Sequence, residues 1–178
     1  MDDVIDDLVP AAAARPRRIE IWLPLLIVVV DQLTKAMIRA TLPLHESVTI
    51  VPGLVDFTHV RNTGAAFGIG ANATSKIVPL LLNAGAIIVF CVVVVYALRS
   101  AVTDRLLQTG LHLILGGAIG NLVDRFRFGY VVDFLDVFVG NHHWPAFNVA
   151  DSAICIGIAL LFLDMRRKPE AETEAVRA

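Results

Sequence analysis

The stretch AGAIIVFCVVVV at residues 84–95 is a continuous apolar run without one charged side chain. It lies within a longer apolar segment, residues 76–98, and about 20 mainly apolar residues are enough for a helix to cross a bilayer. Three further segments meet this requirement, near residues 20–41, 105–123 and 147–165. The sequence therefore predicts an all-α membrane protein with four transmembrane helices.

The composition agrees with a membrane protein. Of the 178 residues, 56% are hydrophobic and only 18% are charged, against roughly 25% charged residues in an ordinary soluble domain. The formal net charge is -2, and without a basic surface the chain is not expected to bind nucleic acid. Cys91 and Cys155 fall inside apolar runs and are interpreted as small core residues. No HExxH or Cys/His spacing occurs, so neither a metal nor a cofactor is expected.

The charged and polar segments divide the chain into three regions. Residues 1–19 and 166–178 are expected to be tails, and residues 20–165 to form the transmembrane domain. Within that domain, two outer loops are expected at about residues 42–75 and 126–146.

The first outer loop carries a signal for a hairpin. Its segments VTIV (residues 48–51) and VDFTHV (residues 55–60) are rich in β-branched and aromatic residues, and Pro52-Gly53 between them is a turn signal. We therefore expect a small extracytoplasmic β-rich subdomain on the membrane surface.

Positively charged residues indicate the orientation, because cytoplasmic loops carry an excess of Lys and Arg. The residues that would face the cytoplasm are Arg15, Arg17, Arg18, Arg99, Arg105, Arg166, Arg167 and Lys168. The opposite side holds Arg39, Arg61, Lys76, Arg125 and Arg127. The balance favours cytoplasmic termini and outward-facing loops.

Two carboxylates flank the entrance to the last apolar segment, Asp133 in VVDF and Asp151 in FNVADS. An ionised carboxylate at a mid-helix position in lipid costs on the order of 3 kcal/mol, so such groups usually face a protein interior or a water-filled pocket. Two converging carboxylates can share a proton, which lets one act as base and the other as acid. The pair suggests an intramembrane aspartyl hydrolase.

Further polar residues group at positions that would surround this pair. Asp31 and Lys35 are four residues apart on one helical face and can form an ion pair. Asn121, Asp124 and Arg125 lie along one side of the end of the third apolar segment. A structural ion pair and solvation of a helix end are the simpler explanations for these two groups.

Two other segments have both a structural and a functional interpretation. Gly64, in the small-residue segment after Asn62, can bring the backbone close to a substrate, although a turn explains it equally well. Asn148 is a suitable N-cap for the last helix, and Asp151 follows it by three residues.

Five motifs in order resemble those of one family: DQLTK (residues 31–35), VRNTGAAFG (residues 60–68), GGAIGNLVDR (residues 116–125), VVDF (residues 131–134) and FNVADS (residues 147–152). The family is the bacterial lipoprotein signal peptidase, also called signal peptidase II or prolipoprotein signal peptidase. The resemblance covers roughly residues 20–165.

The resemblance implies an aspartyl endopeptidase of the bacterial inner membrane. Such an enzyme removes signal peptides from diacylglyceryl-modified prolipoproteins by cleaving before the lipidated cysteine, needs no cofactor, and is expected to work as a monomer in contact with membrane lipid. Asp133 and Asp151 match the catalytic pair. The positions that line or support the site are Asp31, Lys35, Asn62, Gly64, Asn121, Arg125 and Asn148, together with Asp124, for which a structural role is preferred.

Three alternatives remain open. A small transporter would use the same carboxylates as an ion or proton relay. In a membrane scaffold, the polar residues would serve helix association. A serine–lysine hydrolase would use Ser47, Ser75 or Ser152 with Lys35 or Lys76, although no serine lies in a nucleophile-elbow pattern.

Overall fold

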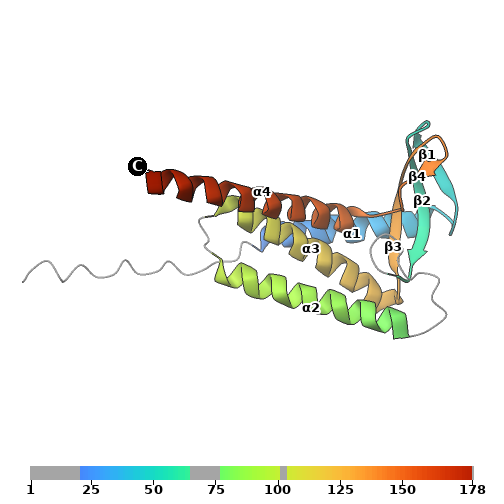
Figure 1. Ribbon diagram of the computed structural model, residues 1–178. Coiled ribbons are helices and arrows are strands. Elements are labelled where there is room, and N and C mark those ends of the chain that lie inside the picture. The colour runs from blue at the N-terminus through green and yellow to red at the C-terminus, as the bar shows by residue number, and fades with distance from the viewer. Residues whose placement is uncertain (1–20, 65–76, 101–103, 178) are drawn as a thin grey trace, which may run out of the picture.

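The computed structural model describes residues 21–64, 77–100 and 104–177. In chain order, its elements are α1 (Trp22–Thr41), β1 (Ser47–Val51), β2 (Val55–Asn62), α2 (Ile77–Arg99), α3 (Arg105–Phe128), β3 (Val131–Val139), β4 (His142–His143) and α4 (Val149–Arg177). The helices form a bundle, and the strands form a sheet that stands across one end of it (Figure 1). The first turn of α1 and the end of α4 lie at the opposite end. The expected tail at residues 1–19 lies outside the described residues.

Helix α3 is the centre of the bundle, because it contacts each of the other three helices. It begins after Asp104, whose side chain accepts a hydrogen bond from the backbone N–H of Leu107 at 3.2 Å. It ends at Gly129, whose φ of +78° lies in the left-handed region that favours glycine. The two caps therefore set where α3 begins and ends.

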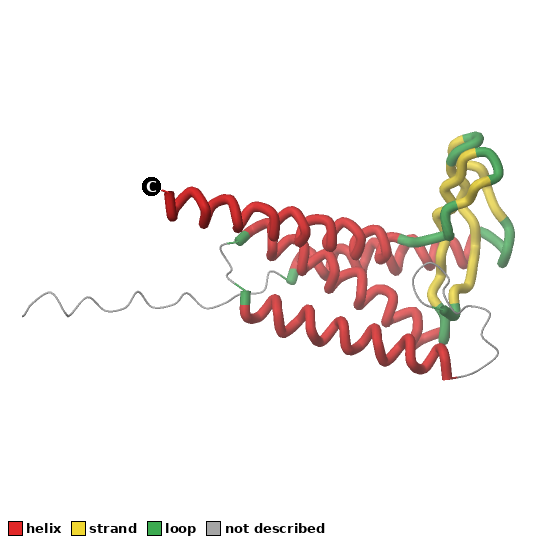
Figure 2. Tube along the Cα trace, in the orientation of Figure 1, coloured by secondary structure: helices red, strands yellow, loops and turns green. Residues whose placement is uncertain are grey.

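The sheet has four antiparallel strands in the order β1-β2-β3-β4 (Figure 2). The predicted hairpin at the first outer loop is confirmed by β1 and β2, and Gly53 between them has a φ of +75°. Residues 65–76 of that expected loop lie outside the described residues.

The second expected outer loop, residues 126–146, has secondary structure of its own. Helix α3 continues to Phe128, and β3 and β4 occupy much of the remainder. The sequence of β3, VVDFLDVFV, is rich in β-branched and aromatic residues, which favour strands. Its two aspartates interrupt the apolar pattern, and for that reason the strand is difficult to recognise from sequence.

A small apolar cluster fastens the sheet to the helices. Ile38 of α1 packs with Val132 and Phe134 of β3, and all three side chains are buried. The ring of Phe57 on β2 meets that of Phe134 edge to face, with the centroids 5.9 Å apart. The register between β2 and β3 pairs Val60 with Asp133. Since β3 is held against α1 and paired with β2, the position of Asp133 is set by both layers.

The expectation of four membrane spans receives partial support. Among the described helices, α3 is the one whose length and hydropathy together suffice to cross a membrane. The apolar part of α2 that meets the same test of composition, Ala84–Arg99, is shorter. The helix bundle and the small antiparallel sheet themselves agree with the predicted fold class.

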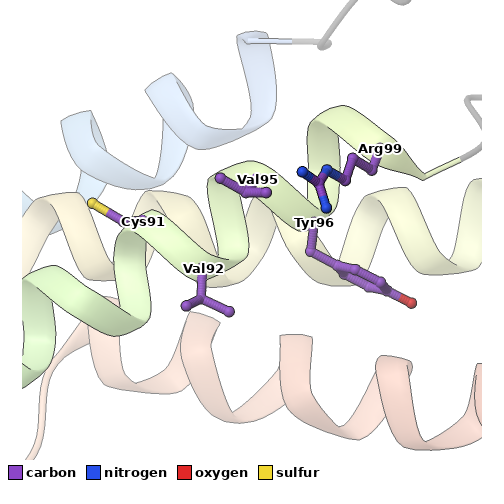
Figure 3. A pocket seen from close by; sticks show the side chains of 5 residues that line it. All are labelled: Cys91, Val92, Val95, Tyr96 and Arg99. Atoms are coloured by element: carbon purple, nitrogen blue, oxygen red, sulfur yellow. The ribbon is translucent and has the colours of Figure 1, made fainter.

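Helix α4 continues to Arg177, so residues 166–177 of the expected C-terminal tail extend the last helix. The interpretation of the two cysteines as core residues needs correction. Cys91 and Cys155 are exposed on helix surfaces and are not core residues. Cys91 lines a shallow hollow on α2 together with Val92, Val95, Tyr96 and Arg99 (Figure 3). None of the predicted site residues lines this hollow.

Candidate active site

Asp133 lies on β3 with its side chain buried, at 2% relative exposure. The side-chain amide of Asn62, at the end of β2, donates to Oδ2 at 2.9 Å. The side-chain amide of Asn148, just before α4, donates to Oδ1 at 2.7 Å. Each oxygen of this carboxyl group is therefore held by an asparagine from a different element.

Asp151 lies in the first turn of α4 and is held in a reciprocal cap. Its backbone N–H donates to Oδ1 of Asn148 at 2.9 Å, and its Oδ2 accepts from the backbone N–H of Asn148 at 3.3 Å. This arrangement has the geometry of a capping box. The predicted N-cap role of Asn148 is confirmed, and the Asn-x-x-Asp spacing is the signal that could have predicted the reciprocal half. The remaining oxygen of Asp151 accepts the side-chain amide of Asn121 at 2.8 Å.

Asn148 thus joins the two carboxyl groups, since its side chain reaches Asp133 and its main chain reaches Asp151. Burial, the largest cause, and the charge of Asp151 together raise the pKa of Asp133 from its ordinary value of 3.8 to about 7. Hydrogen bonds from Asn62 and Asn148 and the charge of Lys35 act in the opposite direction. The predicted pair is therefore brought together in one site, with Asp133 titrating near neutral pH.

Three asparagines, Asn62, Asn121 and Asn148, hold the two carboxyl groups. The orientation of each side-chain amide is set by a donor that binds its Oδ1 atom. An amide oxygen that accepts a hydrogen bond leaves its NH₂ group to point the other way. The donors are Nζ of Lys35 to Asn121 at 2.9 Å, the N–H of Gly64 to Asn62 at 2.9 Å, and the N–H of Asp151 to Asn148 at 2.9 Å. The three NH₂ groups consequently face the two carboxyl groups.

A fully buried ion cluster lies next to this site. Nζ of Lys35 is 2.9 Å from Oδ2 of Asp31 and 3.1 Å from Oδ2 of Asp124, and all three side chains have 0% exposure. The predicted ion pair between Asp31 and Lys35 is confirmed. Asp124 is the additional partner that the sequence did not connect to them.

The cluster also holds the main chain immediately before each carboxylate of the pair. Oδ2 of Asp124 accepts the N–H of Val132 at 3.1 Å, one residue before Asp133. Oδ1 of Asp31 accepts the N–H of Ala150 at 3.0 Å, one residue before Asp151. The buried carboxylates of Asp124 and Asp31 thereby fix the backbone that carries Asp133 and Asp151. This geometry supports the structural role preferred for Asp124.

Gln32 is a site residue that the sequence prediction did not include. Its Nε2 donates to Oδ1 of Asp124 at 3.0 Å and to the carbonyl of Gly120 at 3.2 Å. Its position next to Asp31, within a polar group of an otherwise apolar segment, is the signal that could have identified it. Its contacts tie α1 to α3.

Arg125 and Gly64 meet at the edge of the site. Nη2 of Arg125 donates to the carbonyl of Gly64 at 3.2 Å. The guanidinium also interacts electrostatically with the three carboxylates Asp151, Asp133 and Asp124. The structure therefore places the small-residue turn beside the carboxylate pair, although residues 65–68 of that motif lie outside the described residues.

The serine–lysine alternative is not supported by these contacts. The hydroxyl of Ser152 donates to the main-chain carbonyl of Asn148 at 3.0 Å. Lys35 is engaged by Asp31, Asp124 and Asn121. The two residues serve separate structural contacts.

Comparison with known proteins places this geometry in context. A sequence model of the family described as Signal peptidase (SPase) II matches residues 23–167. The protein named Lipoprotein signal peptidase of Syntrophotalea carbinolica is 48% identical over 147 residues, which are 82% of this chain and 89% of that protein. The protein of the same name from Geobacter metallireducens is 45% identical over 147 residues, with the same shares covered.

Two solved structures, both described as bacterial membrane enzymes studied by the in meso method, resemble the fold. The one at 2.3 Å resolution has a TM-score of 0.73 and 31% identity, and the match covers 83% of this chain and 87% of the other. The one at 1.9 Å resolution has a TM-score of 0.69 and 32% identity, covering 80% and 89%. The matches span the helices, the sheet and the carboxylate site together, and the chain belongs to the signal peptidase II family.

Proposed function

We propose that this chain is an intramembrane aspartyl endopeptidase that removes the signal peptide from diacylglyceryl-modified prolipoproteins by cleaving before the lipidated cysteine. Its catalytic residues are Asp133 and Asp151. The observation that carries the proposal is the bridge through Asn148, which donates to a carboxyl oxygen of each aspartate. A structural cap alone does not require the contact to Asp133.

In the proposed reaction, Asp133 is the acid and Asp151 the base. A pKa of about 7 leaves Asp133 protonated in a large fraction of molecules at neutral pH. Asp151 accepts a proton from water as the water oxygen bonds to the scissile carbonyl carbon, and Asp133 donates its proton to the carbonyl oxygen. The C–N bond then breaks, Asp151 gives its proton to the leaving amine, and the hydroxyl proton returns to Asp133.

General acid–base catalysis of this kind contributes about 100- to 10,000-fold, and positioning of the reacting groups supplies much of the remainder. Positioning is the role we assign to Asn62, Asn121 and Asn148. We assign to Gly64, whose carbonyl accepts a hydrogen bond from Arg125, the role of lining the path of the substrate backbone.

The supporting layer consists of Asp31, Lys35 and Asp124. We assign them no contact with substrate, because their side chains are completely buried. Their role is to hold the backbone before Asp133 and Asp151 and to orient Asn121.

We also propose that all four helices cross the bacterial inner membrane, with both termini cytoplasmic. The arrangement in Figure 1 supports this layout, since the sheet and the start of α4 lie at one end of the bundle and the start of α1 and the end of α4 at the other. Asp133 on β3 and Asp151 in the first turn of α4 belong to the sheet end. The tails at residues 1–19 and 166–178 would then face the cytoplasm, and the site the extracytoplasmic side. The partners are prolipoprotein substrates and membrane lipid, and the proposed working unit is the monomer.

Membership of a peptidase family weighs against the ion-relay alternative. A relay would also leave the closely fitted asparagine amides without a chemical purpose, because proton transfer needs groups that titrate. Proton-coupled uptake into vesicles without cleavage of a precursor would favour the relay over the peptidase.

The test uses two forms of one precursor, with and without the diacylglyceryl group on its cysteine. Incubation with the purified chain is followed by mass spectrometry. The proposal expects a product that begins at the lipidated cysteine and little cleavage of the unmodified form. Equal cleavage of both forms would contradict the lipid requirement, and cleavage at another bond would contradict the assigned site.

A further inference from the structure

Three arginines surround two stacked aromatic rings where the helix bundle meets the sheet. Arg39 of α1 and Arg127 of α3 lie over the ring of Phe128, with guanidinium-to-centroid distances of 4.6 and 5.2 Å. Arg61 of β2 lies over Tyr130 at 4.8 Å, and the two rings stack with centroids 5.8 Å apart. We call these three arginines and two rings the arginine cluster. It joins residues from three elements at one place on the molecule.

The positive charge of this cluster is not balanced by the described residues. Among the described residues, ion pairs join Lys35 to its two carboxylates and His143 to Asp136. None of these pairs includes an arginine of the cluster. Nη1 of Arg39 is buried and has no hydrogen-bond acceptor among the described residues. A buried donor without an acceptor is destabilising, and more so when it is charged. An anion bound between the arginines would supply the missing acceptor and offset their mutual repulsion.

A simpler explanation covers only part of the cluster. Arg39 lies in the last turn of α1 and Arg127 in the last turn of α3, where cations interact favourably with the helix dipole. This does not explain Arg61, which comes from a strand and is exposed. At the other end of the bundle, Arg166 lies over Phe162 alone, at 4.7 Å. Among the described residues, three guanidiniums lying over one pair of stacked rings are therefore found at the sheet end.

The position of the cluster indicates which anion it meets. Phe126, the residue directly before Arg127 on α3, is 77% exposed. In the four-span layout proposed above, the ends of α1 and α3 lie at the outer surface of the bilayer, where an exposed phenyl ring contacts acyl chains and phosphate groups lie at the level of the arginines. Guanidinium groups bind phosphate with two parallel hydrogen bonds.

We propose that the arginine cluster binds the phosphate group of an anionic phospholipid of the outer leaflet, beside and separate from the carboxylate pair. The bound lipid would hold the sheet end of the bundle at a fixed depth. The inference rests on the four-span layout of the proposed function, but it requires no cleavage and can be tested without a substrate.

The test measures phosphatidylglycerol and phosphatidylcholine binding to the full purified chain by native mass spectrometry in a detergent micelle. We expect the wild type to prefer phosphatidylglycerol. The variant Arg39→Gln/Arg61→Gln/Arg127→Gln should bind it about 100-fold more weakly, since each basic residue near a membrane surface contributes about 1 kcal/mol, or about fivefold, and the three losses multiply. The matched control, Arg99→Gln/Arg105→Gln/Arg166→Gln, removes the same charge at the opposite end and should bind as the wild type does.

Several results would overturn the proposal. Equal binding of the two lipids by the wild type would already contradict the proposal. Equal loss of binding in both triple variants would show that the net charge of the protein, and not the arginine cluster, determines binding. Displacement of the lipid by millimolar inorganic phosphate would identify a free anion as the ligand. If the triple variant does not fold, the exposed single change Arg61→Gln replaces it, with a smaller expected loss in the same direction. Unchanged selectivity in that variant would also contradict the proposal.

Discussion

The side-chain amide of Asn148 donates to Oδ1 of Asp133 over 2.7 Å, although the two residues belong to different elements. The same asparagine caps α4 through its amide oxygen. The start of a helix and the position of a buried carboxyl group on a strand are therefore fixed by one side chain. This gives Asn148 two functions that substitutions can separate.

Asn148→Ser and Asn148→Ala separate those functions. Serine is a good N-cap residue, but its shorter side chain cannot reach Oδ1 of Asp133 as the amide of Asn148 does. Asn148→Ser should therefore keep most of the stability and lose activity. Alanine loses both, with a further decrease of about 0.5–2 kcal/mol in the free energy of unfolding. Thermal unfolding of the purified protein and the cleavage rate are measured on the same samples. If Asn148→Ser cleaves the lipidated precursor at the wild-type rate, the contact to Asp133 does not serve catalysis.

The raised pKa of Asp133 predicts how activity depends on pH. The protonated fraction falls as the pH rises through about 7, so an acid role for Asp133 makes kcat/KM fall on the alkaline side. Infrared difference spectroscopy reports the carboxyl C=O band directly. The band should disappear with an apparent midpoint near 7, be absent in Asp133→Asn, and shift to lower pH in Asp151→Asn, because the neighbouring charge is one cause of the shift.

The opposite behaviour would exclude this assignment. A band that titrates near pH 4 in the wild type would show that Asp133 is an ordinary carboxylate. A band that persists unchanged in Asp133→Asn would belong to another residue.

Lys35→Met tests the buried ion cluster. The change leaves two completely buried carboxylates without their cation, and breaking a buried ion pair in this way costs about 3–5 kcal/mol. Cleavage should also slow, because Asn121 loses the donor that orients its amide toward Asp151. Thermal unfolding in detergent gives the loss of stability. The exposed Arg105→Met removes the same charge and should change the stability by less than about 0.5 kcal/mol. Equal unfolding temperatures for the two variants would contradict the structural role of Lys35.

Gly120→Ala tests the close packing of α3 against the same cluster. An added Cβ would lie 2.6 Å from Oδ2 of Asp31, so the carboxylate or the helix must move. Gly85 on α2 is the matched control, since a Cβ there meets nothing within 4 Å. Gly85→Ala should be neutral or stabilise the helix by up to about 1 kcal/mol, and Gly120→Ala should lower both unfolding temperature and activity. Similar effects in the two variants would show that the contact at Gly120 is unimportant.

Much of this arrangement could be predicted from sequence because it depends on local patterns. The apolar runs predicted the four helices, and Pro52-Gly53 predicted the first hairpin. The four-residue spacing of Asp31 and Lys35 predicted their ion pair. Strand β3 was not predicted as an element, because Asp133 and Asp136 interrupt its apolar residues and carboxylates contradict the usual strand pattern.

The contacts between distant segments could not be predicted in this way. Asp124 contacts Lys35, 89 positions away in the sequence, and Val132, eight positions away. The spacing alone does not show whether Asp124 contacts these residues or water. The role of Gln32 depends on the same packing of α1 against α3. The resemblance to a family identified most of these positions without stating why each is needed, and the hydrogen bonds now supply those reasons.

The most direct test of the central claim is cleavage of a lipidated precursor by Asp133→Asn, Asp151→Asn and the matched control Asp136→Asn. Asp136 also lies on β3, but it contacts His143 at 2.9 Å and not the asparagine-held site. Losing one member of an acid–base pair should reduce cleavage by at least about 100-fold, and the control should stay near the wild-type rate. Product mass over time gives the answer: loss in both site variants with an active control is the predicted result, and full activity in either Asp133→Asn or Asp151→Asn would contradict the catalytic pair.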